Sequence, residues 1–423
     1  MYALVDGNSF YASCERVYRP DLRDTPIVVL SNNDGCVITR SSQAKALGIK
    51  MGEPMHKIRN TVNRYGVEVF SSNYELYGDM SRRMMQSIAS LVPRIEVYSI
   101  DECFADVAGM ERIANLTELG REIRARVLQW VGIPTCVGIA PTKTLAKFCN
   151  HLAKRHATFK GVVNWNDWNE SIRTRALNSQ PVGEVWGIGR RLTEQLNAMG
   201  IHTVGDLQRA PSAQIRKLFG VVVERTQREL SGIACIELEH APADKKQLIR
   251  SRSFGKPITD IADIQSALAH HATEAGRDLR RQQSVTHQVG IILQTNPFNP
   301  NDPQYYVNES ICISAGTADT RLINKTAQAI LERSFKAGYK YKKCGIVVTG
   351  IESINAPQQL DWLNPSDSEQ SMMLMQCVDE LNARFGKGSM RLGIERLSSN
   401  WKMRREKLSP CYTGRFGELL RVR

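Results

Sequence analysis

Three acidic residues are the part of this sequence best suited to do chemistry. Asp6 ends an apolar stretch and is followed by Gly7, while Asp101 and Glu102 are adjacent. Neighbouring carboxylates repel one another, and a divalent cation such as Mg²⁺, which prefers carboxylates together with substrate phosphates, relieves that repulsion. The three acids are what a two-metal phosphoryl-transfer centre needs. The alternatives are a turn-forming aspartate and two solvated hairpin acids.

These acids must be positioned by strands that end close together. Residues 1–5 predict one strand, and residues 95–107 predict two strands around a hairpin that contains Asp101 and Glu102. Adjacent side chains of a regular strand point to opposite faces, but at a hairpin apex both acids can converge. Further elements of this mixed α/β region are predicted as strands at 26–30 and 135–139 and helices at 41–47, 74–91, 116–131 and 142–153.

The second half of the chain predicts two more regions. Residues 170–232 indicate short helices separated by glycines, and residues 240–247 form a polar linker. A second mixed α/β module is predicted from about residue 248 to 352. Its elements are helices at 264–281 and 323–337 and strands at 289–294, 310–314 and 345–350, and a last helix is expected at 370–385.

Charge and composition narrow the class of protein. The 423 residues carry a formal net charge of +13, and 42% of them are hydrophobic, which favours a multidomain protein that binds a polyanion. The last 23 residues alone carry seven basic and two acidic side chains. We expect no membrane span and no signal peptide, hence a cytoplasmic protein. The ten cysteines form no C-x-x-C pair, so a structural zinc site is not expected.

Five separated motifs resemble those of Y-family translesion DNA polymerases, specifically the UmuC-type branch. They are the segments 6–15, 31–38, 70–77, 98–102 and 137–147. The resemblance covers essentially the whole chain and implies an α+β multidomain, right-hand polymerase. The implied domains are a ferredoxin-like palm (1–16 and 77–165), small fingers (17–76), a helical thumb with a helix-hairpin-helix (166–236), an α/β little finger that binds DNA (243–353) and a UmuC-type C-terminal tail (354–423).

The resemblance also implies roles for individual residues. Asp6 and Asp101 match ligands that bridge two Mg²⁺ ions, Glu102 matches a ligand of the catalytic ion, and the Gly7 carbonyl matches a backbone ligand. Tyr11 aligns with the steric gate, an aromatic ring that leaves no room for a ribose 2′-hydroxyl. The residues implied to contact the dNTP are Phe10, Tyr11, Thr39, Arg40, Lys45 and Lys154. At positions where the family often has a tyrosine and an arginine, this chain has Ser42 and Lys45.

Other segments indicate contacts with DNA and with proteins. The segment that contains Gly187, Gly189 and Arg190 resembles a helix-hairpin-helix. Its glycines let backbone N–H groups approach a phosphate closely. Candidates for backbone contacts in the little finger are Arg250, Arg252, Lys256, Arg280 and Arg281. Residues Gln359, Leu360, Asp361, Trp362 and Leu363 resemble a peptide that binds the beta sliding clamp. By resemblance, the further partners are primer-template DNA, a processed UmuD-type dimer and RecA.

The expected function is that of an error-prone, template-directed DNA polymerase that performs translesion synthesis in the SOS response and associates with the nucleoid when active. Two Mg²⁺ ions would assist attack of the primer 3′-hydroxyl on a dNTP. A non-catalytic DNA-binding scaffold is one rival, but a scaffold does not need three clustered acids. A two-metal nuclease is another, but a nuclease does not need a steric gate or cations for a triphosphate.

Overall fold

The computed structural model describes residues 1–239, 243–356, 369–396, 401 and 403–419. The chain divides into two compact units. The first unit contains residues 1–31, 35–241 and 407–423, and the second contains residues 32–34 and 242–406. The last residues of the chain therefore belong to the same unit as its first residues. None of the helices described is long and apolar enough to cross a membrane.

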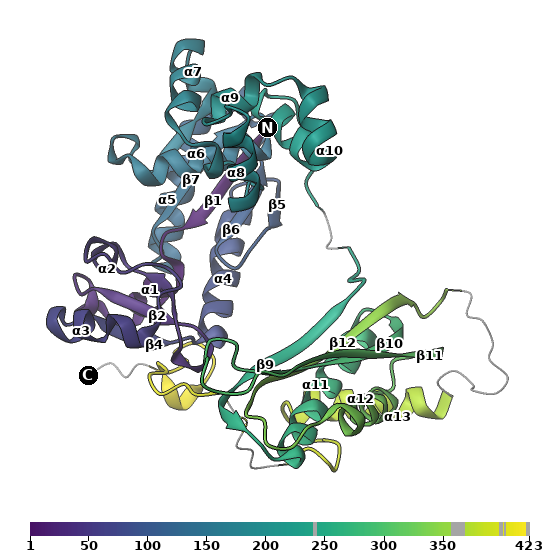
Figure 1. Ribbon diagram of the computed structural model, residues 1–423. Coiled ribbons are helices and arrows are strands. Elements are labelled where there is room, and N and C mark those ends of the chain that lie inside the picture. The colour runs from purple at the N-terminus through teal and green to yellow at the C-terminus, as the bar shows by residue number, and fades with distance from the viewer. Residues whose placement is uncertain (240–242, 357–368, 397–400, 402, 420–423) are drawn as a thin grey trace. The chain divides into compact units, whose positions relative to one another are not determined.

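A five-stranded sheet forms the centre of the first unit (Figure 1). Its strand order is β5-β6-β1-β7-β8, and all neighbours are antiparallel except β7 and β8. The first four strands in this order have the ferredoxin-like arrangement expected of the palm. The strands are β1 (Tyr2–Gly7), β5 (Arg94–Val97), β6 (Glu102–Asp106), β7 (Thr135–Ala140) and β8 (Val162–Asn164).

The two faces of this sheet are covered by different helices. On β1, Ala3 and Val5 join a core with α4 (Tyr74–Ala89) and α5 (Leu116–Val131). Leu4 points the other way and joins a second core with α6 (Lys143–Arg155). Because side chains alternate along a strand, Asp6 is expected on the same face as Leu4, toward α6.

A smaller sheet and a group of helices complete the first unit, and they lie at opposite ends of it (Figure 1). The smaller sheet has the order β3-β2-β4. At this end lie β2 (Ile27–Leu30), β3 (Val37–Arg40), β4 (Glu68–Ser71), α1 (Phe10–Tyr18), α2 (Ser42–Ala46) and α3 (Met55–Tyr65). At the other end lie α7 (Glu170–Ser179), α8 (Arg190–Ala198), α9 (Val204–Arg209) and α10 (Ser212–Leu230).

A buried glutamate fixes α10 to α6. Glu229 is fully buried, and its Oε2 accepts hydrogen bonds from the backbone N–H and the hydroxyl of Thr144, at 2.9 and 2.7 Å. The hydroxyl of Thr142 donates to the Glu229 carbonyl at 2.8 Å. Satisfying a buried carboxylate in this way makes the position of α10 on the sheet specific.

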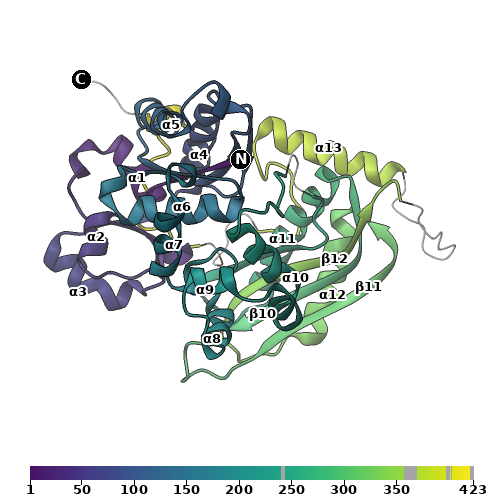
Figure 2. The ribbon, with the colours of Figure 1, turned by 90° about the horizontal axis from the view of Figure 1, so that it is seen from above.

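The second unit is a four-stranded antiparallel sheet in the order β11-β10-β12-β9. Its helices lie on one side of the sheet, and α11 and α12 run along the strands (Figures 1 and 2). The strands are longer than the sequence indicated, and β9 was missed. The elements are β9 (Leu248–Ile258), α11 (Ile261–Arg281), β10 (Ser284–Thr295), β11 (Tyr306–Thr317), α12 (Thr320–Ser334), β12 (Tyr341–Ser353) and α13 (Glu369–Phe385).

The described residues that follow β12 contribute to the core of each unit. Arg280 of α11 binds Asp379 of α13 through two hydrogen bonds, at 2.7 and 2.8 Å. Trp401 is buried in the core of the second unit. Beyond residue 406 the chain belongs to the first unit, where Cys411 joins the core beside α1 and α4.

A buried histidine gives the second unit a pH-dependent stability. Burial, together with the charges of His270, Arg252 and Arg250, lowers the pKa of His271 from 6.5 to about 3. Among the described residues its Nε2 has no hydrogen-bond partner. The unfolded chain then binds this proton more tightly, so the free energy of unfolding is highest above pH 6.5 and decreases as the pH falls toward 3.

We expect the second unit to lose on the order of 2 kcal/mol of stability from this group between pH 7 and pH 5. Hydrogen exchange of α11, corrected for intrinsic rates, measures the loss in the intact chain. His271→Asn should flatten the pH dependence, and His202→Asn, at an exposed site, should leave it unchanged. An equal slope in the wild type and His271→Asn would contradict the prediction.

Candidate active site

Asp6 and Glu102 face each other across two neighbouring strands. They are paired in register between β1 and β6, and their carboxyl groups are hydrogen-bonded to each other. Asp6 is only 4% exposed. The neighbouring Phe104 packs in the core on the α6 side of the sheet, which places Glu102 on that same face by strand alternation.

The pKa values of the two acids are shifted in opposite directions. Burial, and then the hydrogen bond with Glu102, raises the pKa of Asp6 to about 8. Burial also pushes the pKa of Glu102 upward, but hydrogen bonds from Asp6 and Lys147 outweigh it, and that pKa lies below its ordinary value. Two acids held this close fit a divalent cation, because such an ion removes the repulsion that otherwise keeps one of them protonated.

Two lysines of α6 reach the acid pair. Lys154 Nζ lies 2.5 Å from Asp6 Oδ2, and Lys147 Nζ lies 2.7 Å from Glu102 Oε2. The lysines are seven residues apart, which is two helical turns, so both project from one face of α6. Lys154 was expected from the resemblance, but Lys147 was missed. Its spacing from Lys154 is the signal that would have found it.

Lys147 is also held by two aromatic rings. Its Nζ lies 4.7 Å from the centre of the Tyr98 ring and 5.7 Å from that of Trp186. The Trp186 Nε1 donates a hydrogen bond to the Tyr98 hydroxyl at 3.1 Å. These cation–π contacts fix the ammonium group beside Glu102.

Asp101 is connected to the strand of Asp6 by a backbone hydrogen bond. Its carbonyl accepts a hydrogen bond from the Gly7 N–H at 2.8 Å, so Gly7 and Asp101 lie at the same edge of the sheet. Its carboxylate accepts a hydrogen bond from the Ser99 hydroxyl at 2.6 Å. In the described part of the chain, no three His, Cys, Asp or Glu side chains form a group that could hold a metal. The side chains thus bring two of the three expected acids together, and Asp101 is next to them.

Tyr11 lies on α1, just after the acidic strand, within a group of aromatic rings. It stacks on Tyr77 with ring centres 4.4 Å apart and an angle of 15° between the rings. The ring centres of Tyr74 and Phe10 lie 6.1 and 5.9 Å from that of Tyr11. Burial raises the pKa of the Tyr11 hydroxyl to about 12, so the ring stays neutral.

A cluster of positive charge lies beside the acids. Burial, followed by the charges of Arg40 and Lys154, lowers the pKa of Lys45, and Asp6 partly offsets this. Lys45 Nζ donates to the Ser9 hydroxyl at 3.3 Å, at the start of α1. Arg40 donates to the Ile49 carbonyl at 3.0 Å. Cations that repel one another at a helix N-terminus form a favourable place for an anion.

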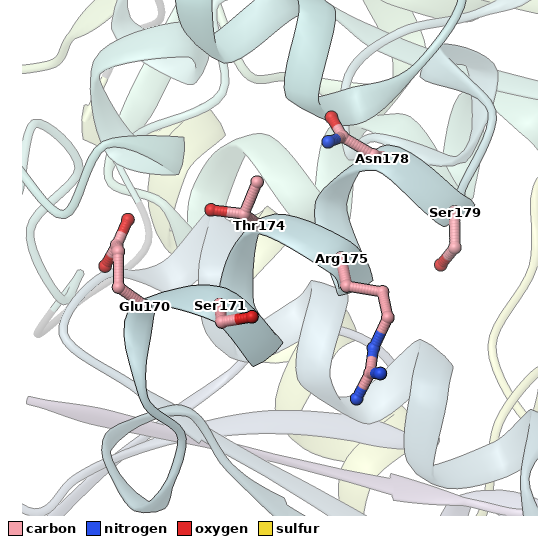
Figure 3. A pocket seen from close by; sticks show the side chains of 6 residues that line it. All are labelled: Glu170, Ser171, Thr174, Arg175, Asn178 and Ser179. Carbon is pink, nitrogen blue, oxygen red and sulfur yellow. The ribbon is translucent and has the colours of Figure 1, made fainter.

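Glu102 of the acid pair borders a cleft of about 190 Å³ in the first unit. Glu102, Lys147 and Lys154 line it together with Glu184 and Trp186. A larger hollow of about 650 Å³ runs along α7 (Figure 3) and contains none of the expected site residues. Its lining residues are Glu170, Ser171, Thr174, Arg175, Asn178 and Ser179.

The glycines expected to approach DNA lie in the turn before α8. Gly187 has a φ of +87°, in the left-handed region, and a Cβ added at Gly189 would meet nothing within 4 Å. Gly189 is the N-cap of α8, and the preceding helix is only the single 3-10 turn Val182–Glu184. The side chain of Arg190 is 90% exposed. The backbone here is open to a ligand at a helix N-terminus.

The basic residues of β9, unlike the glycine turn before α8, lie within a strand whose face is partly buried. Arg250 and Arg252 alternate with Ile249 and Ser251 and so share a face with the core residue Phe254. Arg250 forms an ion pair with Asp278 of α11. Arg252 and Lys256 are exposed. The expected clamp-binding residues 359–363 lie outside the described residues.

Comparison with known proteins identifies relatives over the whole chain. Residues 5–151 match the impB/mucB/samB family, residues 245–362 match the C-terminal domain of that family, and residues 372–422 match a domain of unknown function. The chain is 44% identical to protein UmuC of Salmonella typhimurium, covering 100% of both chains, and 44% identical to its protein ImpB, covering 99% of both. It is 26% identical to DNA polymerase IV 1 of Bacillus subtilis, over 92% of this chain and 91% of that one.

Solved structures show the same fold. A Y-family DNA polymerase chimera of Dbh and Dpo4 has a TM-score of 0.65 at 21% identity, covering 83% of this chain and 99% of the other. An insertion ternary complex of Dbh DNA polymerase has a TM-score of 0.55 at 22% identity, with the same coverage.

Proposed function

The chain belongs to the impB/mucB/samB family, and on that premise we propose that its acid pair and Asp101 form the catalytic centre of nucleotidyl transfer. The chain is an error-prone, DNA-directed DNA polymerase of the Y family that carries out translesion synthesis. It uses a divalent metal and dNTPs, and we propose Mg²⁺ as the metal. The observation that carries this proposal is the register pairing of Asp6 with Glu102 beside Lys154 and Lys147.

In the proposed mechanism the carboxylates of Asp6, Asp101 and Glu102 and the Gly7 carbonyl would hold two Mg²⁺ ions. When bound, these ions lower the pKa of the primer 3′-hydroxyl and neutralise the triphosphate. Asp101, whose carboxylate accepts a hydrogen bond from Ser99, would be the third carboxylate ligand. No protein side chain is assigned as the general base.

The cations bind the triphosphate in this proposal. Arg40 of β3 and Lys45 of α2 are positioned so that the charge of Lys45 interacts with Arg40, Lys154 and Asp6, and Lys154 lies 2.5 Å from Asp6. Thr39 precedes Arg40 on β3. Phe10, which follows Ser9 in the sequence, is buried. Lysine binds phosphate as a point charge, whereas arginine can bind it with two hydrogen bonds. Tyr11, stacked on Tyr77, serves as the steric gate.

DNA binding follows from the family, and the particular contacts are proposals. We assign phosphate contacts to the turn at Gly187 and Gly189 and to Arg190, Arg252 and Lys256. Arg250 is a weaker candidate, because it is paired with Asp278. A UmuD-type dimer, RecA and, through residues 359–363, the beta sliding clamp are proposed partners, and the SOS response and the nucleoid are the proposed setting.

Primer extension with Mg²⁺ and dNTPs on an undamaged template tests this function. A polymerase lengthens the primer according to the template. A two-metal nuclease would shorten the primer, and a DNA-binding scaffold would leave it unchanged. Either of the last two results would contradict the proposal.

Lys154→Ala is expected to raise the KM for dNTP about tenfold, because it removes one charge-assisted contact to the triphosphate. Steady-state single-nucleotide insertion measures the change. Lys57→Ala, which removes an exposed lysine of α3, is the matched control. If both variants have the wild-type KM, Lys154 does not bind the nucleotide.

A further inference from the structure

The C-terminal segment 407–415 packs against α1 and α4 in the first unit. The backbone of Lys407 pairs with Ser71, which donates its N–H to the Lys407 carbonyl at 2.8 Å and accepts from the Lys407 N–H at its hydroxyl, at 3.0 Å. Asn73 Nδ2 donates to the Ser409 carbonyl at 2.9 Å and to the Ser409 hydroxyl at 3.1 Å. Ser409 is 7% exposed. These contacts fix the segment along the start of α4.

Aromatic and ionic contacts continue the same packing. Tyr412 stacks on Tyr18 of α1 with ring centres 4.7 Å apart at 16°. Arg415 pairs with Glu75 of α4 at 3.1 Å. The segment is thus bound on both helices that carry the aromatic group around Tyr11.

Ser409 also binds a buried acid. Glu15 of α1 is fully buried, and its Oε1 accepts hydrogen bonds from the Tyr77 hydroxyl at 2.6 Å and from the Ser409 hydroxyl at 2.9 Å. Burial raises the pKa of Glu15 to about 7, although both hydroxyls lower it. A buried carboxyl group needs its donors, since an unsatisfied one costs free energy. In the described part of the chain, Ser409 is therefore one of the two side chains that donate a hydrogen bond to Glu15.

Glu15 in turn fixes Tyr77, and Tyr77 fixes Tyr11. The Tyr77 ring is bound at its hydroxyl by Glu15 and stacks with its face on Tyr11. Tyr11 and Glu15 are four residues apart on α1, so they lie on the same helical face. The contacts thus run without a break from Ser409 through Glu15 and Tyr77 to the Tyr11 ring.

We propose that the C-terminal segment is a positioning element for sugar selection, with Ser409 holding the Tyr11 ring in place through Glu15 and Tyr77. This inference rests on the proposed function, because it takes Tyr11 as the steric gate. It gives a role within the polymerase itself to part of the domain of unknown function at residues 372–422. A Tyr11 ring that is less firmly held admits the 2′-hydroxyl of a ribonucleotide more readily. Ser409 therefore acts on the selection of dNTP over rNTP indirectly, through Glu15 and Tyr77.

Ser409→Ala in the full chain tests the proposal. The readout is the ratio of kcat/KM for dNTP to that for the matching rNTP, measured by single-nucleotide insertion. We expect this ratio to fall roughly three- to tenfold. Without the Ser409 hydroxyl the buried Glu15 carboxyl group loses a donor, so Glu15 holds the Tyr77 ring less firmly. Ser409→Thr, which keeps the hydroxyl, should restore the ratio. Leu408→Ala, at an exposed neighbour, should leave it unchanged.

Two further variants separate the possible failures. Tyr11→Ala tests the gate: if it leaves the ratio unchanged, the gate assignment in the proposed function fails, and this inference fails with it. If Tyr11→Ala lowers the ratio and Ser409→Ala does not, only the positioning role of the segment is overturned. Tyr77→Phe keeps the ring but removes its hydrogen bond to Glu15, so it should lower the ratio even if Ser409→Ala does not fold. A wild-type ratio in Tyr77→Phe would overturn the proposal.

Discussion

Asp6→Asn is expected to lower the rate of primer extension by about 10³-fold, since metal-assisted stabilisation of the transition state is worth several kcal/mol. Asparagine has nearly the same shape but lacks the negative charge that Mg²⁺ requires. Asp101→Ala should abolish extension as well, because the resemblance makes Asp101 a ligand of both ions. Single-turnover extension of a labelled primer measures both effects.

Binding of primer-template DNA should remain nearly intact in both variants, as measured by fluorescence anisotropy. Asp106→Asn is the matched control, because Asp106 lies on the same strand as Glu102 and pairs with Arg94 away from the acid pair. Its extension rate should be close to that of the wild type. Unchanged extension in Asp6→Asn or Asp101→Ala would remove that residue from the metal centre.

Tyr11→Ala is expected to increase incorporation of ribonucleotides relative to deoxyribonucleotides on the order of 10²-fold, because specificity here depends on excluding one hydroxyl by contact with the ring. The stack of Tyr11 on Tyr77 positions a flat surface that alanine lacks. Insertion of rNTP and dNTP opposite the same template base measures the ratio. Tyr65→Ala, at an exposed tyrosine of α3, is the control, and an unchanged ratio in Tyr11→Ala would contradict the gate assignment.

Much of the fold could be predicted from the pattern of apolar residues. The strand at 1–5 and the hairpin around Asp101 and Glu102 are present, because short apolar strands and their turns are local features. The palm-type strand order was expected only from the family resemblance. The edge strand β9 was missed because its arginines and serines interrupt the apolar alternation.

The types of residue in the site could be predicted from the sequence, but which side chains contact one another could not. Nothing local specifies that Asp6 lies opposite Glu102, because that register depends on contacts between residues almost a hundred positions apart. The same applies to Lys147, which reaches Glu102 only once α6 has packed on the sheet. Only the family resemblance assigned different roles to Asp101 and Glu102, although strand alternation directs their side chains differently.

The role of the C-terminal segment could not have been predicted from its composition. Its basic residues indicated a partner or DNA, but its buried side chains are Ser409 and Cys411. Glu15 looks like an ordinary helical glutamate in the sequence. Its burial becomes apparent only when residues almost four hundred positions away supply a hydrogen bond to it.

Translesion synthesis by this chain can be measured as primer extension across an abasic site. The assay uses the wild-type chain with Mg²⁺ and dNTPs, with and without a processed UmuD-type dimer and a RecA filament, and Asp6→Asn as the inactive control. We expect products that extend past the lesion position, with bypass increased by the two partners and absent in Asp6→Asn. Primers that stop at the abasic site under all conditions, while an undamaged template is copied, would contradict translesion synthesis by this chain.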